Sequence, residues 1–178
     1  MKKMHVTVLA LFVMFGLLSF VQAQQDKKSE DTDKTTAIKW YDYESGWEKA
    51  KAEKKHMFVD FTATWCTWCK KLDRNTFSKP EVIQSLNSDF VPVKVWDNDP
   101  DTLDIDGFKI TVRDLIKREF RVTGYPALWF VSPEGTRIGP AGGYVDAERF
   151  MKYLDIVKNY KYDSTRNENG DKIKPDEG

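Results

Sequence analysis

The two cysteines of this 178-residue chain are Cys66 and Cys69, and only Thr67 and Trp68 separate them. A structural disulfide stabilises a fold mainly by closing a loop of the unfolded chain, and a loop this short gains little. A structural zinc site requires about four ligands, and beyond the first residues the chain adds only His56 to the two cysteines. The spacing therefore favours redox chemistry over a structural disulfide or a metal site.

Redox chemistry gives the two thiols different roles. A thiolate attacks a disulfide to form a mixed disulfide, which a second nearby thiol then resolves. A helix that begins near Cys66 would place this sulfur beside free backbone N–H groups and the positive end of the helix dipole, which favour an anion. We therefore expect Cys66 to be the nucleophile and Cys69, one turn deeper, to be the resolving thiol. The Cys66–Cys69 disulfide is the redox group that we expect, with no metal and no bound cofactor.

An acidic residue, Asp60, interrupts the apolar run Met57–Phe61. Side chains alternate along a strand, so Asp60 shares a face with Phe58 and Thr62, which favours burial over a position at a solvated sheet edge. Burial raises the pKa of a carboxyl group because the charged form loses its hydration. Asp60 is therefore a candidate proton acceptor near neutral pH.

Strands and helices alternate around these residues. Apolar runs predict buried strands at 57–62, 91–96 and 127–131, with 136–138 closing a hairpin. N-cap residues and helical periodicity predict helices at 45–54, 66–75, 80–87 and 112–120, and a last helix after the cap Asp146. The first helix opens with the capping box Ser45–Glu48. Residues 97–107 are expected to be an acidic loop, in which Asp104–Gly107 is interpreted as a solvated turn. The pattern indicates an α/β fold with a central mixed β-sheet flanked by helices.

The two ends of the chain differ in composition from its middle. Residues 1–23 combine two lysines, a short apolar run and small residues before Ala23, which predicts a signal peptide cleaved after that residue. An uncleaved membrane anchor is the alternative, although the apolar run is shorter than the about 20 residues that span a bilayer. Residues 24–36 predict a disordered linker and residues 161–178 a flexible polar tail, because both are highly polar. Residues 37–160 form one domain of ordinary size.

The charge balance of the chain bears on the class of partner that it can attract. Cleavage would remove two of the 28 basic residues. The balance of the remaining basic residues with the 28 acidic residues is a net charge near −2. This balance favours neither nucleic acid nor an anionic membrane as a partner. We expect an exported protein, located in the periplasm or secreted.

Three segments of the chain resemble the thioredoxin superfamily. They are the run Asp60-Phe61-x-Ala63-x-Trp65-Cys66-x-x-Cys69-Lys70, the pair Tyr125-Pro126 before a strand, and the glycine turn Gly142-Gly143. Within the superfamily, Cys66–Leu72 with Thr76–Ser78 and Pro80–Val82 is similar to the C-terminal domain of DsbD and to related exported thioredoxin-like proteins. The likeness spans roughly residues 37–160, which is the range of the predicted domain.

The resemblance implies a thioredoxin-like fold and a thiol–disulfide oxidoreductase that acts on disulfides in proteins. It implies that Asp60 takes the proton of the resolving thiol and that Pro126 forms a cis peptide bond beside the cysteines. The backbone at Tyr125 would then pair with a substrate segment. The implied substrate-binding residues are Trp65, Thr67, Trp68, Tyr125 and Pro126, whereas Trp129 is expected in the core.

The chain also departs from the family pattern. The dipeptide between the cysteines is Thr-Trp rather than Gly-Pro or Pro-His, and it brings no charge that would stabilise a thiolate. A strongly oxidising potential is therefore not favoured, and we expect reduction of protein disulfides with electrons from a membrane thiol donor of the DsbD type. An oxidase or isomerase, or a redox-silent binding module with this fold, stays open. Lys94 is expected on the face of its strand opposite to Asp60, and a monomer is expected.

Overall fold

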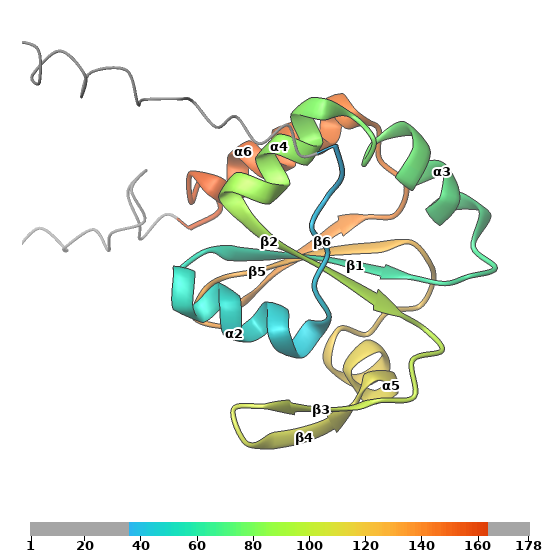
Figure 1. The fold of residues 1–178 in the computed structure, drawn as a ribbon, viewed down its shortest axis with the longest axis vertical. Coiled ribbons are helices and arrows are strands. Elements are labelled where there is room, and N and C mark those ends of the chain that lie inside the picture. Colours follow the sequence, from blue (N-terminus) through green and yellow to red (C-terminus); the bar gives the residue numbers. More distant parts are fainter. Residues whose placement is uncertain (1–35, 164–178) are drawn as a thin grey trace, which may run out of the picture. The chain divides into compact units, whose positions relative to one another are not determined.

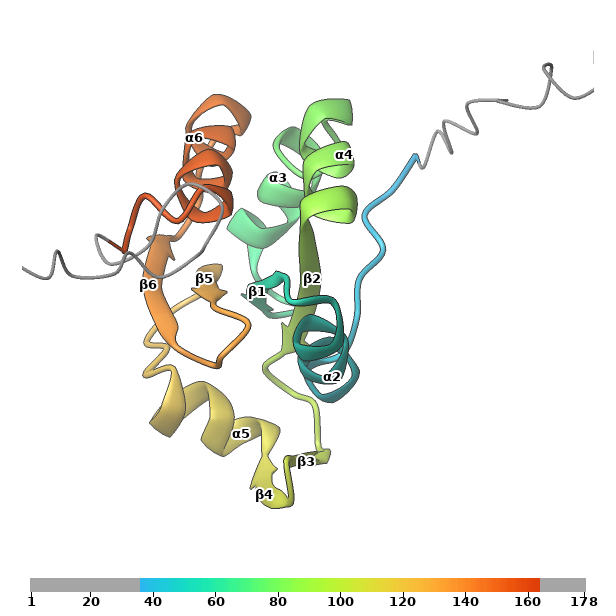
Figure 2. The ribbon, with the colours of Figure 1, turned by 90° about the vertical axis from the view of Figure 1, so that its left-hand side faces the viewer.

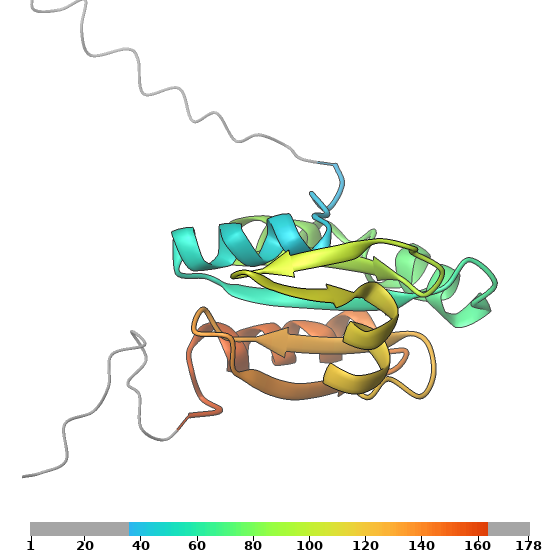
Figure 3. The same cartoon turned by 90° about the horizontal axis from the view of Figure 1, so that it is seen from below.

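The computed structural model describes residues 36–163, so the predicted signal peptide, nearly all of the predicted linker and most of the predicted tail lie outside the described residues. Within this range, β1 (His56–Thr62) is the strand to which the rest of the main sheet attaches. It pairs in parallel with β2 (Phe90–Trp96) and antiparallel with β5 (Ala127–Val131), and β5 pairs antiparallel with β6 (Arg137–Gly142). The strand order β2-β1-β5-β6 makes a mixed sheet, which confirms the predicted fold class (Figure 1). Seen from below, the β5–β6 pair lies along one side of β1 (Figure 3).

Helices cover both faces of this sheet. Their bounds are α2 (Tyr43–Glu53), α3 (Thr67–Asn75), α4 (Pro80–Asp89), α5 (Val112–Asp114), the π-helix η2 (Leu115–Glu119) and α6 (Ala147–Lys158). Figure 2 shows α3, α4 and α6 on one side of the strands, and α2 with α5 on the other. No helix within residues 36–163 is long and apolar enough to cross a bilayer.

Alternation along β1 produces two hydrophobic cores. Met57, Val59 and Phe61 pack with α2, α5 and η2 in the first core. Phe58 packs with α3, α4 and α6 in the second core, where Phe77 and Phe150 surround its ring. All residues of β1 are buried because it is a central strand covered on both faces.

A hairpin begins within the segment that is expected to be an acidic loop. Strands β3 (Thr102–Ile105) and β4 (Phe108–Thr111) pair antiparallel, and Leu103 and Ile110 face each other in the first core. The connecting residues Asp106 and Gly107 both have positive φ, at 55° and 84°. Asp-Gly is a strong signal for a two-residue hairpin turn. The exposed turn at Asp106-Gly107 agrees with the expected solvated turn, whereas the expectation of an acidic loop was wrong for β3.

Two helix predictions also need correction. Helix α2 begins after Asp42, whose carboxylate accepts a hydrogen bond from the Ser45 N–H at 2.8 Å, so Ser45 lies inside the helix instead of capping it. The segment predicted as one helix at 112–120 changes from three α-helical residues to the π-helix Leu115–Glu119. At the end of the domain, Tyr162 belongs to the packed structure, because its hydroxyl lies 2.6 Å from Nε2 of His56.

A glycine in α2 permits the close approach of this helix to β2. A Cβ atom at Gly46 would lie 2.3 Å from Cγ2 of the fully buried Val93. We expect Gly46→Ala to lower the free energy of unfolding by about 1–3 kcal/mol through overpacking, measured by urea denaturation. Alanine in an unobstructed helix would instead raise it by about 0.5–1 kcal/mol, so a rise would contradict this packing. Gly124→Ala is the control, since a Cβ there meets nothing within 4 Å.

Candidate active site

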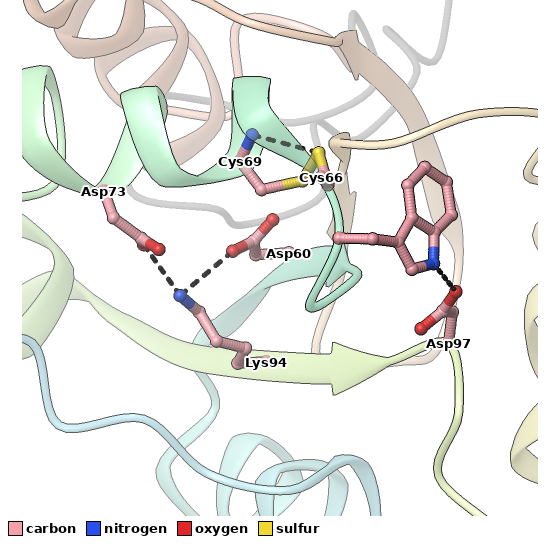
Figure 4. The surroundings of a disulfide bond; sticks show 7 residues. Asp60, Cys66, Cys69, Asp73, Lys94 and Asp97 are labelled. Carbon is pink, nitrogen blue, oxygen red and sulfur yellow. Dashed lines mark hydrogen bonds and ion pairs between the residues drawn. A yellow bond between two sulfur atoms is a disulfide. The ribbon is translucent and has the colours of Figure 1, made fainter.

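The two cysteines form a disulfide at the N-terminus of α3 (Figure 4). Cys66 is the N-cap residue, and its Sγ accepts a hydrogen bond from the Cys69 N–H at 3.0 Å. Leu72 anchors α3 in the second core, which fixes the start of this helix at the end of the loop that follows β1. In the reduced protein, a thiolate at Cys66 would sit where the free N–H groups of the helix favour an anion.

Asp60 is buried in β1, with 1% of its surface exposed. Figure 4 shows its carboxylate between the disulfide and Lys94. Burial raises the pKa of Asp60 to about 6; the nearby Lys94 ammonium opposes this rise, and the Asp73 carboxylate adds to it. Within the described part of the chain, Oδ1 of Asp60 has no hydrogen-bond partner. The carboxyl group can therefore exchange a proton near neutral pH on the inner side of the disulfide.

The expectation for Lys94 was wrong, because this side chain lies on the same face of the sheet as Asp60. The parallel register pairs Asp60 directly with Lys94, and paired residues of neighbouring strands share a face. The Lys94 ammonium lies 3.4 Å from Oδ2 of Asp60 and 2.8 Å from Oδ1 of Asp73. Sequence reasoning missed Asp73 entirely, although it follows Cys69 by one helical turn. The sequence does contain a signal for this pair, because Lys94 is a cation within the apolar run of β2 and Asp60 is an acid within that of β1.

Aromatic side chains lie on both sides of the disulfide. Trp65 is 68% exposed, packs against Tyr125 with ring centroids 5.9 Å apart, and donates its indole N–H to Oδ2 of Asp97 at 3.1 Å. Trp68 is 54% exposed and packs against Tyr144 at 5.3 Å. No local pattern in the sequence indicates that Asp97 and Tyr144 belong to this region, because contacts between distant segments depend on the fold.

The proline loop completes the surroundings of the cysteines. The peptide bond between Tyr125 and Pro126 is cis, Pro126 is buried, and Tyr125 packs against the cluster formed by the two cysteines and Ala63. Thr67 is exposed beside Cys66. The structure therefore brings the predicted catalytic and substrate-binding residues into one region. Trp129 lies apart from it, partly buried against Phe120.

Three successive residues of the turn before α6 contact different parts of this region. A Cβ at Gly143 would lie 3.4 Å from the carbonyl oxygen of Pro126. Tyr144 packs against Trp68, and the Val145 carbonyl accepts a hydrogen bond from the Thr76 hydroxyl at 2.6 Å. The turn thus joins the proline loop to both ends of α3.

Comparison with known proteins agrees with this geometry. Residues 43–158 match the model of a protein family described as "Thioredoxin-like domain". The "Thiol:disulfide interchange protein DsbD 2" of Pseudomonas aeruginosa is 31% identical over 111 residues, which cover 61% of this chain and 17% of that protein. The "Thiol:disulfide interchange protein DsbD" of Campylobacter jejuni is 31% identical over 120 residues, 65% of this chain and 19% of that protein. This chain therefore spans less than a fifth of the length of these two relatives.

A solved structure supports the same assignment. The solution structure of a thioredoxin from Thermus thermophilus superposes with a TM-score of 0.55 at 26% identity, over 68% of this chain and 87% of that chain. Together with the family match, this confirms the resemblance to the thioredoxin superfamily that the sequence motifs indicated.

The buried carboxyl group should make stability depend on pH. Its pKa is about 6 in the folded protein against an ordinary value of 3.8, so the folded state binds more protons between these values. The free energy of unfolding should therefore fall as the pH rises from about 4 to about 6, and stay low above that. Because one pKa unit corresponds to about 1.4 kcal/mol, Asp60→Asn should raise the free energy of unfolding at pH 7 by up to about 3 kcal/mol.

Urea denaturation of the disulfide form between pH 4 and pH 8 measures this effect. The variant should also lose the fall in stability between about pH 4 and pH 6. The exposed Asp101→Asn is the control and should keep the wild-type pH profile. An Asp60→Asn protein that is less stable at pH 7, with an unchanged pH profile, would contradict the assignment.

Proposed function

Because this chain belongs to the thioredoxin-like domain family, we propose that it is an exported thiol–disulfide oxidoreductase that reduces disulfides in partner proteins. The observation that carries the proposal is the disulfide at the N-terminus of α3, where Cys66 caps the helix and the buried Asp60 lies behind it. In this proposal Cys66 supplies the nucleophile, Cys69 the resolving thiol and Asp60 the proton acceptor.

The first step uses the reduced protein. The Cys66 thiolate attacks one sulfur of the partner's disulfide and forms a mixed disulfide with it, while the partner's other sulfur leaves as a thiolate and takes a proton from water. The helix N-terminus favours the anionic sulfur before the attack, because the Cys69 N–H points at it.

The second step releases the partner. The Asp60 carboxylate takes the proton of the Cys69 thiol, and the resulting thiolate attacks Sγ of Cys66. The bond between Cys66 and the partner breaks, and the partner's second sulfur leaves as a thiolate that solvent protonates. Two electrons have then passed to the partner, and the protein holds the Cys66–Cys69 disulfide.

The electrostatics of the site support reduction rather than oxidation. A strong oxidant of this kind stabilises its reduced, thiolate form. Here the side chains between the cysteines are Thr67 and Trp68, which carry no charge, and the buried Asp60 carboxylate disfavours a second negative charge nearby. The reduced pair is therefore only weakly stabilised and gives up its electrons readily.

The exposed rings beside the disulfide support binding of a polypeptide. Trp65 and Trp68 present large apolar surfaces to solvent, and Tyr125 stands beside the first of them. Exposed aromatic side chains commonly anchor protein partners. We propose that Trp65, Thr67, Trp68 and the Tyr125–Pro126 loop contact the polypeptide around the partner's disulfide.

An exported reductase needs a source of electrons, because its compartment is oxidising. The signal-peptide features of residues 1–23 support export. We propose a membrane thiol protein of the DsbD type as the donor, since the relatives at 31% identity carry the name thiol:disulfide interchange protein DsbD.

Substitution of each cysteine should separate the two steps. With dithiothreitol as electron source, wild-type protein should accelerate the reduction of insulin, and Cys66→Ser should abolish the acceleration. Cys69→Ser should accumulate a mixed disulfide with insulin, visible by mass spectrometry, because the resolving thiol is missing. Equal rates for wild type and Cys66→Ser would instead indicate a redox-silent binding module.

The reduction potential should identify the direction of the reaction. We expect a value well below the about −120 mV of DsbA and closer to the about −270 mV of thioredoxin. Equilibration with dithiothreitol or glutathione buffers, followed by alkylation of free thiols, measures it. A value near −120 mV would favour an oxidase, and one near about −180 mV, as in protein disulfide isomerase, would favour an isomerase.

A further inference from the structure

The outer side of α3, next to the disulfide, carries three cations. Lys70 and Arg74 are exposed, and Lys71 is partly exposed. None of them pairs with a carboxylate among residues 36–163. The acidic residue of this helix, Asp73, pairs instead with Lys94 on the inner side. The positive charge of this surface is therefore uncompensated by the described part of the protein.

Two aromatic rings orient one of these cations. The Lys71 ammonium lies 4.6 Å from the ring centroid of Trp68 and 5.1 Å from that of Tyr144. Asn75 holds the second ring by donating a hydrogen bond to the Tyr144 hydroxyl at 3.4 Å. A cation over aromatic faces gains attraction from the rings, so Lys71 is positioned on the same side of the disulfide as the exposed face of Trp68.

The other side of the disulfide has a different character. There Trp65 contacts the Asp97 carboxylate, and Tyr125 packs beside its ring. The whole chain has a formal net charge of zero, so long-range attraction of a charged partner by the entire molecule is weak. The local group of unpaired cations then has the larger effect on which charged segment of a partner is attracted to the cysteines, and on the side of the disulfide where it binds.

We propose that Lys70, Lys71 and Arg74, together with Trp68 and Tyr144, form a docking surface for an acidic segment of the partner protein, next to the partner's disulfide. We call these five residues the basic face. This inference rests on the proposed function and adds a substrate class to it. The cations supply charge complementarity, and the exposed ring of Trp68 supplies apolar contact.

Three peptides that differ in charge alone test the surface. Each carries one disulfide flanked by four glutamates, four glutamines or four lysines, and dithiothreitol regenerates the protein. Wild-type protein should show a KM for the glutamate peptide about five- to tenfold below that for the glutamine peptide at low salt, from a few exposed ion pairs. The difference should shrink at about 1 M salt, where the Debye length is about 3 Å.

Matched double variants locate the effect on the molecule. Lys71→Gln/Arg74→Gln should bring the KM ratio of the glutamate and glutamine peptides close to one. The control Lys109→Gln/Arg113→Gln removes the same charge from exposed positions in β4 and α5, which lie away from α3 (Figure 1), and should keep the wild-type ratio.

The outcomes distinguish this inference from the function on which it rests. If wild-type protein reduces all three peptides with the same KM, the basic face has no part in substrate choice and the inference is wrong, while the proposed function stands. A preference for the glutamate peptide that survives in Lys71→Gln/Arg74→Gln would also overturn it. If wild-type protein reduces none of the peptides, both the inference and the proposed function fail.

Discussion

A carboxylate buried in the central strand is the constraint on which the site depends. Asp60 lies between apolar residues in β1, and burial makes its charged form unfavourable in free energy. The parallel register places Lys94 beside it, and Asp73 shares that cation from α3. The acid thus keeps a raised pKa with only partial compensation, under a disulfide that sits at the tip of the same helix. The order of elements β1, loop and α3 explains why the acid and the two sulfurs are close together.

The two faces of the main sheet pack against different helices, and only one of them carries Asp60. Odd-numbered side chains of β1 build a core with α2, α5 and η2, and the β3–β4 hairpin closes that core with Leu103 and Ile110. Even-numbered side chains face α3, α4 and α6, and Asp60 lies at the end of this second core nearest the cysteines. The β3–β4 hairpin thus extends the core on the face opposite to Asp60.

Local patterns were sufficient for the strands of the main sheet, the start of α3 and the burial of Asp60, because each depends on a few neighbouring residues. Contacts that depend on register or on the meeting of distant segments were out of reach. Lys94 was assigned to the wrong face because a sequence does not state how two parallel strands align. Tyr144 and Asp97 reach the site only through the fold. The hairpin at Asp106-Gly107 is different, since its signal was local and was outweighed by the acidic composition around it.

The turn at residues 143–145 contacts the site from outside the Cys66–Cys69 motif. Gly143 lies against the Pro126 carbonyl, Tyr144 against Trp68, and Val145 against Thr76. The proline loop, the indole of Trp68 and the C-terminal end of α3 thus all contact the short segment that precedes α6. A displacement of α6 along the sheet would therefore also move the proline loop, Trp68 and the end of α3. The last helix thus positions the site, although it contributes no reacting atom.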